Sequence, residues 1–222
     1  MSNFLVIGDV HGESYWKKII EDNSPPLIFF LGDYCDSHKR TPREIIDNMI
    51  EIFDYARKNP DTVYLLVGNH DFHYMGYANS PYSGYNFAFT EEYKEVLLKN
   101  KDLFNMAITI ESPNDKILIS HAGVTNTFLE RNNLTVETLN DAWENTPKIF
   151  DFVREKNSNP YGDDIYQSPI WVRPEALMKD MVKDYHQIVG HTYVRQTRTF
   201  EINEKMSLNI ICSHDENNFA VW

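Results

Sequence analysis

The stretch TVYLLVGNHD, residues 62–71, leads from an apolar run through a glycine to an amide, an imidazole and a carboxylate. The apolar run is typical of a buried strand. Polar residues are common where a strand ends, but Asn69, His70 and Asp71 carry groups that bind metal ions or transfer protons. They would indicate a functional site if the rest of the chain places similar groups at the ends of other strands.

Such partners follow four other predicted strands. GDVHG (8–12) follows the run at 4–8, GDYCD (32–36) follows the run at 27–32, and HAG (121–123) and GHT (190–192) end the runs at 116–123 and 185–192. Open α/β sheets place their ligand sites at the carboxyl ends of strands. Four of the eight histidines fall in these clusters, namely His11, His70, His121 and His191, whereas His38, His73, His186 and His214 are expected at the surface or in supporting positions.

Strands and helices alternate along the first half of the chain. Strands are predicted at 4–8, 27–32 and 62–68, and helices at 14–21 and 41–59, where Thr41 suits the cap and Pro42 the first turn. Strands that are apolar throughout indicate a sheet covered on both faces. The expected fold is α/β with mixed β-sheets, in a single domain over residues 1–222.

The second half is less regular. A helix is predicted at 90–101, short helical pieces within 125–156, and strands at 104–110, 116–123, 185–192, 197–202, 207–213 and 219–222. The turn SPND (112–115) should pair the first two of these strands. A loop is expected at 157–164. The aromatic stretch 74–89 is equally consistent with a packed loop and with a lid over substrate.

Composition limits the class of protein. With 42% hydrophobic and 24% charged residues, the 222-residue chain is typical of a globular protein. It has no apolar run long enough to span a membrane, and its start, MSNFLVIGDVHG, lacks the features of a signal peptide. Two cysteines fit a reducing compartment, so a cytoplasmic location is expected. The formal charge of −12 argues against binding to duplex nucleic acid.

The five clusters in this order resemble the calcineurin-like metallophosphoesterases, and within them the phosphoprotein phosphatase and diadenosine-tetraphosphatase branch, which includes small phage and bacterial Ser/Thr phosphatases. The resemblance extends from Gly8 to Thr192. It implies the metallophosphoesterase fold, in which mixed β-sheets pack as a sandwich flanked by helices. It also implies two divalent metal ions, manganese foremost with iron or zinc as alternatives, since nitrogen and oxygen donors suit these metals.

Carried over residue by residue, the resemblance assigns roles to eight side chains. The implied metal ligands are Asp9 and His11 for the first ion, Asp33 as the bridge, and Asn69, His121 and His191 for the second. His70 would be the general acid for the leaving oxygen, and Asp36 would hold His70 by a hydrogen bond.

Phosphate binding is where the chain departs from the branch. The arginine that usually follows the second acid is replaced by Ser37 in DSHKR. Arg40 is one candidate substitute, and Arg173 in WVRP, which resembles a phosphate-binding stretch of bacterial relatives, is the better one. Arginine suits this role because its planar fork pairs with two phosphate oxygens.

The leading functional hypothesis is a metal-dependent phosphoric ester hydrolase that cleaves phosphomonoesters, as Ser/Thr phosphatases do, with a metal-activated hydroxide. The alternative substrate is a dinucleoside polyphosphate or another nucleotide. A third reading, a scaffold without turnover, is disfavoured because His70, Asp36 and every matched ligand are present.

Overall fold

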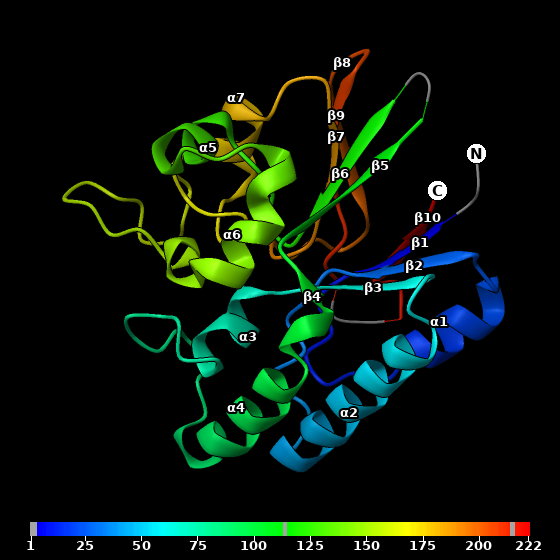
Figure 1. Ribbon diagram of the computed structural model, residues 1–222. Helices are drawn as coiled ribbons and strands as arrows, with labels where there is room; N and C mark the ends of the chain where they lie inside the picture. Colours follow the sequence, from blue (N-terminus) through cyan, green and yellow to red (C-terminus); the bar gives the residue numbers. More distant parts are fainter. Residues whose placement is uncertain (1–3, 113–114, 214–215) are drawn as a thin grey trace.

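The computed structural model describes residues 4–112, 115–213 and 216–222. Two five-stranded β-sheets pack against each other, and helices cover their outer faces (Figure 1). The first sheet has the order β10-β1-β2-β3-β4, with β1 (Phe4–Ile7), β2 (Leu27–Phe30), β3 (Val63–Leu66), β4 (Phe104–Asn105) and β10 (Phe219–Val221). Strands β1 to β4 run parallel, and β10 is antiparallel to β1 at the edge.

The second sheet is also mixed. Its order is β5-β6-β7-β9-β8, with β5 (Ala107–Glu111), β6 (Lys116–Ser120), β7 (His186–Val189), β8 (Arg198–Asn203) and β9 (Met206–Ile210). Strands β6, β7 and β9 are parallel, and the edge strands β5 and β8 are antiparallel to their neighbours. The predicted α/β fold of mixed sheets in a sandwich flanked by helices is therefore confirmed.

Alternate side chains of each parallel strand face different layers, because successive residues of a strand point to opposite faces. In β1, Phe4 and Val6 belong to the apolar layer between the two sheets, together with Ile119 of β6. Leu5 and Ile7 pack instead with the helices outside the first sheet. Both faces are buried, which explains why these strands are apolar throughout.

Seven α-helices and four 3-10 helices are found in the described residues. The α-helices are α1 (Trp16–Asn23), α2 (Pro42–Lys58), α3 (Asn69–Tyr74), α4 (Thr90–Lys99), α5 (Asn126–Asn132), α6 (Leu139–Asn145) and α7 (Pro174–Asp180). The 3-10 helices are η1 (Phe87–Phe89), η2 (Lys101–Leu103), η3 (Val136–Thr138) and η4 (Pro147–Phe150). Helices α1, α2 and α4 lie outside the first sheet (Figure 1), and α7 packs Ala176 and Leu177 on the outer face of the second. Thr41 caps α2 in a capping box with Glu44, as its sequence predicts.

Two local predictions are wrong. The run at 104–110 is not one strand, because the chain leaves the first sheet after Asn105 and enters the second at Ala107. The amides of Met106 and Ala107 donate at this crossing to the Asn140 Oδ1 atom, at 2.8 and 3.2 Å. The second error is an omission: no helix was predicted after the strand at 62–68, but α3 begins at Asn69. The predicted turn at 112–115 includes residues outside the described ranges.

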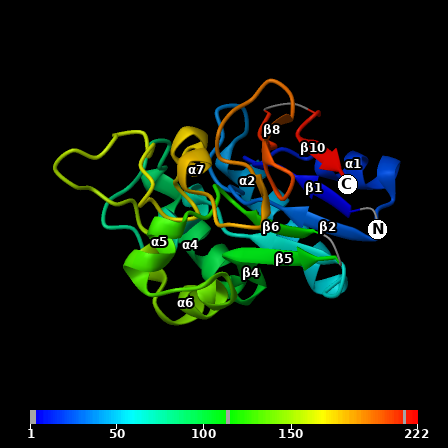
Figure 2. The ribbon, with the colours of Figure 1, turned by 90° about the horizontal axis from the view of Figure 1, so that it is seen from above.

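The carboxyl ends of five parallel strands meet at one edge of the sandwich. His11 N–H donates to the Asp33 carbonyl at 2.7 Å, joining the loops after β1 and β2, and Gly190 N–H donates to the His121 carbonyl at 2.7 Å, joining those after β6 and β7. His191 N–H reaches across to the Asp9 carboxylate at 2.9 Å. Helices α5, α6 and α7 gather beyond one end of the strands, and the chain termini lie at the other (Figure 2). None of the described helices has the length and apolar character needed to cross a bilayer.

Candidate metal centre

Three histidines at this edge each donate one ring proton to a backbone carbonyl. His11 Nδ1 lies 2.9 Å from the Asp36 carbonyl, His121 Nδ1 lies 2.8 Å from the Leu31 carbonyl, and His191 Nε2 lies 3.2 Å from the Trp171 carbonyl. Because a carbonyl oxygen only accepts, each of these nitrogens carries the proton. The other ring nitrogen of each histidine is left with a lone pair, the form that binds a metal ion.

Carboxylates and imidazoles of the described residues form three groups with spacing suited to a metal ion: one consists of Asp36, His70 and His73, and the other two share one residue. Ligand atoms of Asp9, His11 and Asp33 lie within 4.8 Å of one another, and so do those of Asp33, His121 and His191. Asp33 is 1% exposed and stands between the groups. Burial opposes its ionisation, but the surrounding imidazoles lower its pKa. Burial also lowers the pKa of His191 well below the ordinary value, which keeps its imidazole neutral.

Three electron-pair donors converge around His121. Its Nε2 atom lies 3.0 Å from the Asn69 Oδ1 and 3.5 Å from the Asp33 Oδ2. His121 Nδ1 already carries the proton that goes to Leu31, so no proton lies among these three atoms when the ring is neutral. All three are buried, and buried acceptors without a donor are costly. A cation placed among them would satisfy all three, so the donor set fits the divalent ions that the family resemblance implies.

Buried Asp71 holds the loop that carries Asp33. Its carboxylate accepts four backbone N–H groups: from Asp33 at 2.9 Å, Tyr34 at 2.8 Å, Cys35 at 3.2 Å and Gly68 at 3.0 Å. Gly68 has no room for a side chain, because a Cβ atom there would collide with the Asp33 carboxylate. The last residue of GNHD is therefore the anchor of the neighbouring loop.

Much of this site has a left-handed backbone. His11, Asp33, Asp36 and His191 have φ of 46°, 52°, 56° and 60°, and they are four of the seven non-glycine residues with positive φ in the described chain. A residue other than glycine is strained in this region. The hydrogen bonds that hold these loops compensate for that strain, and the result is that side chains from separate strands point at one another.

His70 and Asp36 form a hydrogen-bonded pair beside the two groups. His70 Nδ1 lies 2.8 Å from the Asp36 Oδ2, and the backbone N–H of His70 donates to the Asp33 Oδ1 at 2.9 Å. Burial disfavours the charged imidazole, but the Asp33 and Asp36 carboxylates raise the pKa of His70 to about 9. The ring is therefore protonated at neutral pH, with Nε2 as the nitrogen that does not face Asp36.

The two arginines predicted to bind phosphate occupy different settings. Arg173 lies against the centre, where Nη1 donates to the His191 carbonyl at 2.9 Å and Nε donates to the Tyr161 carbonyl at 3.0 Å. Arg40 is paired with Glu13, whose Oε2 accepts from Nε at 3.1 Å and from Nη2 at 2.7 Å. The structure thus brings Arg173 to the predicted metal ligand His191 and engages Arg40 in an ion pair with Glu13.

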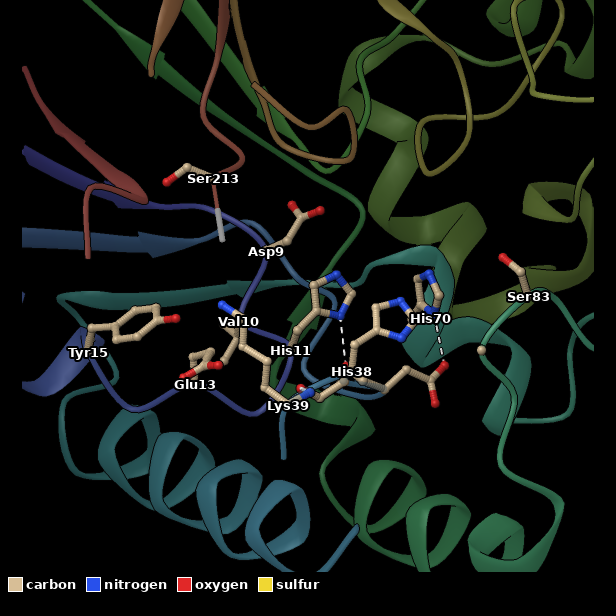
Figure 3. A pocket seen from close by; sticks show the side chains of 13 residues that line it. Asp9, Val10, His11, Glu13, Tyr15, His38, Lys39, His70, Ser83 and Ser213 are labelled. Atoms are coloured by element: carbon tan, nitrogen blue, oxygen red, sulfur yellow. Dashed lines mark hydrogen bonds and ion pairs between the residues drawn. The ribbon is translucent and has the colours of Figure 1, made fainter. Parts of the chain in front are cut away.

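A pocket of about 300 Å³ opens beside the centre. Its lining includes Asp9, His11, Asp36 and His70 of the predicted site, and it adds Glu13, Tyr15, Ser37, His38, Lys39, Ser83 and Gly84. Tyr15 lies toward one end and Ser83 toward the other, with His11 and His70 between them (Figure 3). Lys39 and His38 were not expected here. The signal for them was available in DSHKR (36–40), which begins three residues after the predicted bridging acid Asp33.

Comparisons with known proteins agree with this architecture. A profile of the calcineurin-like phosphoesterase family matches residues 2–195. The chain is similar to the cold-active protein-tyrosine phosphatase of a psychrophile Shewanella sp., with a TM-score of 0.57 and 16% identity over 94% of this chain and 70% of that one. It is also similar to a protein serine/threonine phosphatase from Saccharomyces cerevisiae, with a TM-score of 0.58 and 14% identity over 95% of this chain and 67% of that one.

At these identities the two structures establish the fold alone, and the family rests on the profile. A comparison with curated proteins finds no match. The profile covers most of the chain, so this protein belongs to the calcineurin-like phosphoesterase family and is a metal-dependent phosphoric ester hydrolase.

Proposed function

We propose that this protein hydrolyses phosphomonoesters with two divalent metal ions, manganese foremost and iron or zinc as alternatives. The observation that carries the proposal is the pair of donor groups that share Asp33. Asp9 and His11 would bind one ion, Asn69, His121 and His191 would bind the other, and Asp33 would bridge them. A shared carboxylate is the arrangement expected of two ions that hold one phosphoryl group.

When bound, divalent ions neutralise phosphate oxygens and make a water molecule nucleophilic near neutral pH. The protein's own part is to supply the proton. His70 carries a proton on the nitrogen that does not face Asp36, and it lines the pocket. It would give this proton to the oxygen that leaves phosphorus, so that the product departs as an alcohol. Asp36 would stabilise the imidazolium and keep its orientation.

Arg173 would bind the phosphate oxygens from the side of His191. Its guanidinium is already oriented by the carbonyls of His191 and Tyr161. Arg40 stays a weaker candidate, because its bond with Glu13 would have to be exchanged for one with phosphate. Lys39 and Ser37 both line the pocket, so Lys39 offers a cation two residues from the position where the branch has its arginine.

The preferred substrate class is a phosphoserine or phosphothreonine protein, supported by likeness in fold to a protein serine/threonine phosphatase. A second candidate is a nucleotide anhydride such as a dinucleoside polyphosphate. It is favoured by the pocket, where an aromatic ring of Tyr15 and the cation of Lys39 accompany the centre. Both candidates use the same centre and differ in the group that leaves.

Further proposals concern the chain as a whole. Residues 1–222 would act as one metallophosphoesterase domain. A cytoplasmic location is supported by Cys35 and Cys212, which are both free thiols. The formal charge of −12 supports the expectation that duplex nucleic acid is not a partner.

The test is hydrolysis of an aryl phosphate and an aryl phosphodiester by protein stripped with a chelator and reloaded with manganese. We expect manganese-dependent cleavage of the monoester, and a loss of about 100-fold or more in His70→Asn with metal content unchanged. Asp33→Asn should instead lower the number of bound ions, measured by elemental analysis. His186→Asn is the matched control, because His186 lies in β7 and bonds to Ser207.

Two results would contradict the proposal. Full activity in His70→Asn would remove this residue from proton transfer. Two ions still bound in Asp33→Asn would contradict the bridge. A panel of phosphopeptides and nucleotides then separates the two substrate classes.

A further inference from the structure

The Asp36 carboxylate is held by more than His70. Its Oδ2 atom lies 2.8 Å from His70 Nδ1 and 3.2 Å from His73 Nε2, and its Oδ1 atom accepts from the Tyr74 hydroxyl at 2.6 Å. All three side chains come from α3, where positions three and four residues apart lie on the same face. One turn of this helix therefore places His70, His73 and Tyr74 around a single carboxylate.

The proton of His73 can be assigned from its other contact. His73 Nδ1 accepts the backbone N–H of Tyr82 at 3.2 Å, so the ring carries its proton on Nε2. The side chain is fully buried. Its Nε2 atom lies 3.2 Å from Asp36 Oδ2, a polar contact that falls short of regular hydrogen-bond geometry, and it has no hydrogen-bond partner among the described residues. Burial keeps this imidazole neutral by lowering its pKa. His73 thus orients the carboxylate without adding a positive charge that would compete with His70.

The loop between α3 and η1 fixes the position of His73. The rings of Tyr82 and Tyr85 contact it with centroid distances of 5.1 and 4.8 Å. Asp151 in turn accepts the Tyr82 hydroxyl and the Asn79 backbone N–H, the latter at 2.9 Å. The aromatic stretch is therefore a packed loop with anchored contacts, and it packs against His73 beside the Asp36 carboxylate.

These contacts matter for the position of Asp36, because its backbone conformation is strained. Its φ of 56° is left-handed, and the residue is only 7% exposed. Gly84 of the same loop packs directly over the pair, since a Cβ atom there would lie 3.5 Å from His70 Cε1 and 3.6 Å from Asp36 Oδ2. A carboxylate that rotated by one rotamer would lose its bond to His70.

We propose that His73 and Tyr74 are positioning residues of the reaction: they hold the Asp36 carboxylate so that His70 presents its Nε2 proton to the leaving oxygen. The inference rests on the proposed role of His70 as proton donor. It predicts that loss of either contact slows only those substrates whose leaving group needs a proton.

The test compares two leaving groups. Phenolate, whose conjugate acid has a pKa of about 10, needs a proton to leave, whereas dinitrophenolate leaves without one. His73→Asn keeps an amide near the Nδ1 position for the Tyr82 N–H but withdraws the donor from Asp36. His73→Gln does the reverse, because its amide reaches the Nε2 position. Tyr74→Phe removes the hydroxyl donor.

We expect His73→Asn and Tyr74→Phe to lower kcat for phenyl phosphate by about 10-fold, a fraction of the 10²–10⁴ that a general acid supplies. Values for dinitrophenyl phosphate, KM and bound metal should stay within about 2-fold, and His73→Gln should restore most of the activity. Equal losses on both substrates, or no rescue by Gln, would overturn the proposal and leave His73 a purely structural residue. If His73→Asn does not fold, Tyr74→Phe gives the same comparison.

The reference variant is His70→Asn, measured with the same two substrates. One outcome would refute only the positioning role: His70→Asn has a lower kcat for phenyl phosphate alone, while His73→Asn and Tyr74→Phe keep the kcat of the wild type. Equal losses of His70→Asn on both substrates would instead refute His70 as the proton donor, and with it the basis of this inference.

Discussion

Replacement of Asp71 by Asn tests how strongly the loop of Asp33 is anchored. Each Asp71 oxygen accepts two backbone N–H groups: Oδ2 from Asp33 and Gly68, and Oδ1 from Tyr34 and Cys35. An amide has one oxygen and one NH₂ group. Whichever way the Asn amide turns, its NH₂ group faces two N–H donors and leaves both without an acceptor.

The expected loss follows from that count. A buried donor without a partner costs about 1–3 kcal/mol, so two such donors reduce the free energy of unfolding by about 2–6 kcal/mol. This is a large part of the about 5–15 kcal/mol that stabilises a typical domain. The residue is 0% exposed, so water does not replace the lost acceptor.

The assay is urea unfolding at pH 8 with a chelator present. Burial and the neighbouring Asp33 charge raise the pKa of Asp71 to about 7, so the carboxylate is ionised at this pH. Asp61→Asn, at an exposed position, is the matched control and should change stability by less than about 0.5 kcal/mol. A loss below about 1 kcal/mol in Asp71→Asn, with an unchanged m-value, would refute the anchoring role.

Three further perturbations test other parts of the site. Gly68→Ala places a methyl group against the Asp33 carboxylate, so elemental analysis should find less bound metal per chain. An unchanged metal content would show that the loop of Asp33 can move away from the methyl group. Burial raises the pKa of Asp36, but hydrogen bonds from two imidazoles and a phenol lower it to about 2. This charge therefore adds stability above about pH 4 that is lost as the pH falls toward 2, and the wild type should lose about 2 kcal/mol more than Asp36→Asn over that range in unfolding experiments. Equal losses in the two proteins would contradict this account. Asp151→Asn weakens the acceptor of the Tyr82 hydroxyl and the Asn79 amide, so amide hydrogen exchange in this loop should speed up by about 5-fold or more, as expected for a loss of about 1 kcal/mol; unchanged protection would mean that its ring contacts suffice.

The parallel strands and α2 were predictable because their signals are local. A strand buried on both faces is apolar throughout, and α2 begins with Thr41 and Pro42 and repeats its apolar residues at helical spacing. The carboxyl ends of the parallel strands were predicted one to three residues too long. Gly68, for example, keeps an extended backbone but lies outside β3. Helix α3 was missed because its polar first turn has the composition of a bend.

Contacts between segments far apart in the sequence could not be predicted from the sequence. The crossing at Met106 depends on Asn140, 34 residues away, which caps two amides at the point where the chain changes sheets. The pairing of Arg40 with Glu13 likewise joins residues 27 positions apart. His73 was expected in a supporting position, but only the folded chain identifies Asp36 as the group it supports. By contrast, α7 begins with Pro174 and could have been read from RPEALMKD.

The left-handed backbone at His11, Asp33, Asp36 and His191 sets stability against function in this protein. Each such residue costs about 1–2 kcal/mol, whereas glycine adopts the same conformation without that cost. Glycine would remove that cost, but it would also remove the contacts of the side chain. At Asp36 the lost carboxylate would offset the gain, because its charge adds about 2 kcal/mol of stability above about pH 4. The strained side chains are therefore kept in place by their own contacts as well as by selection for turnover.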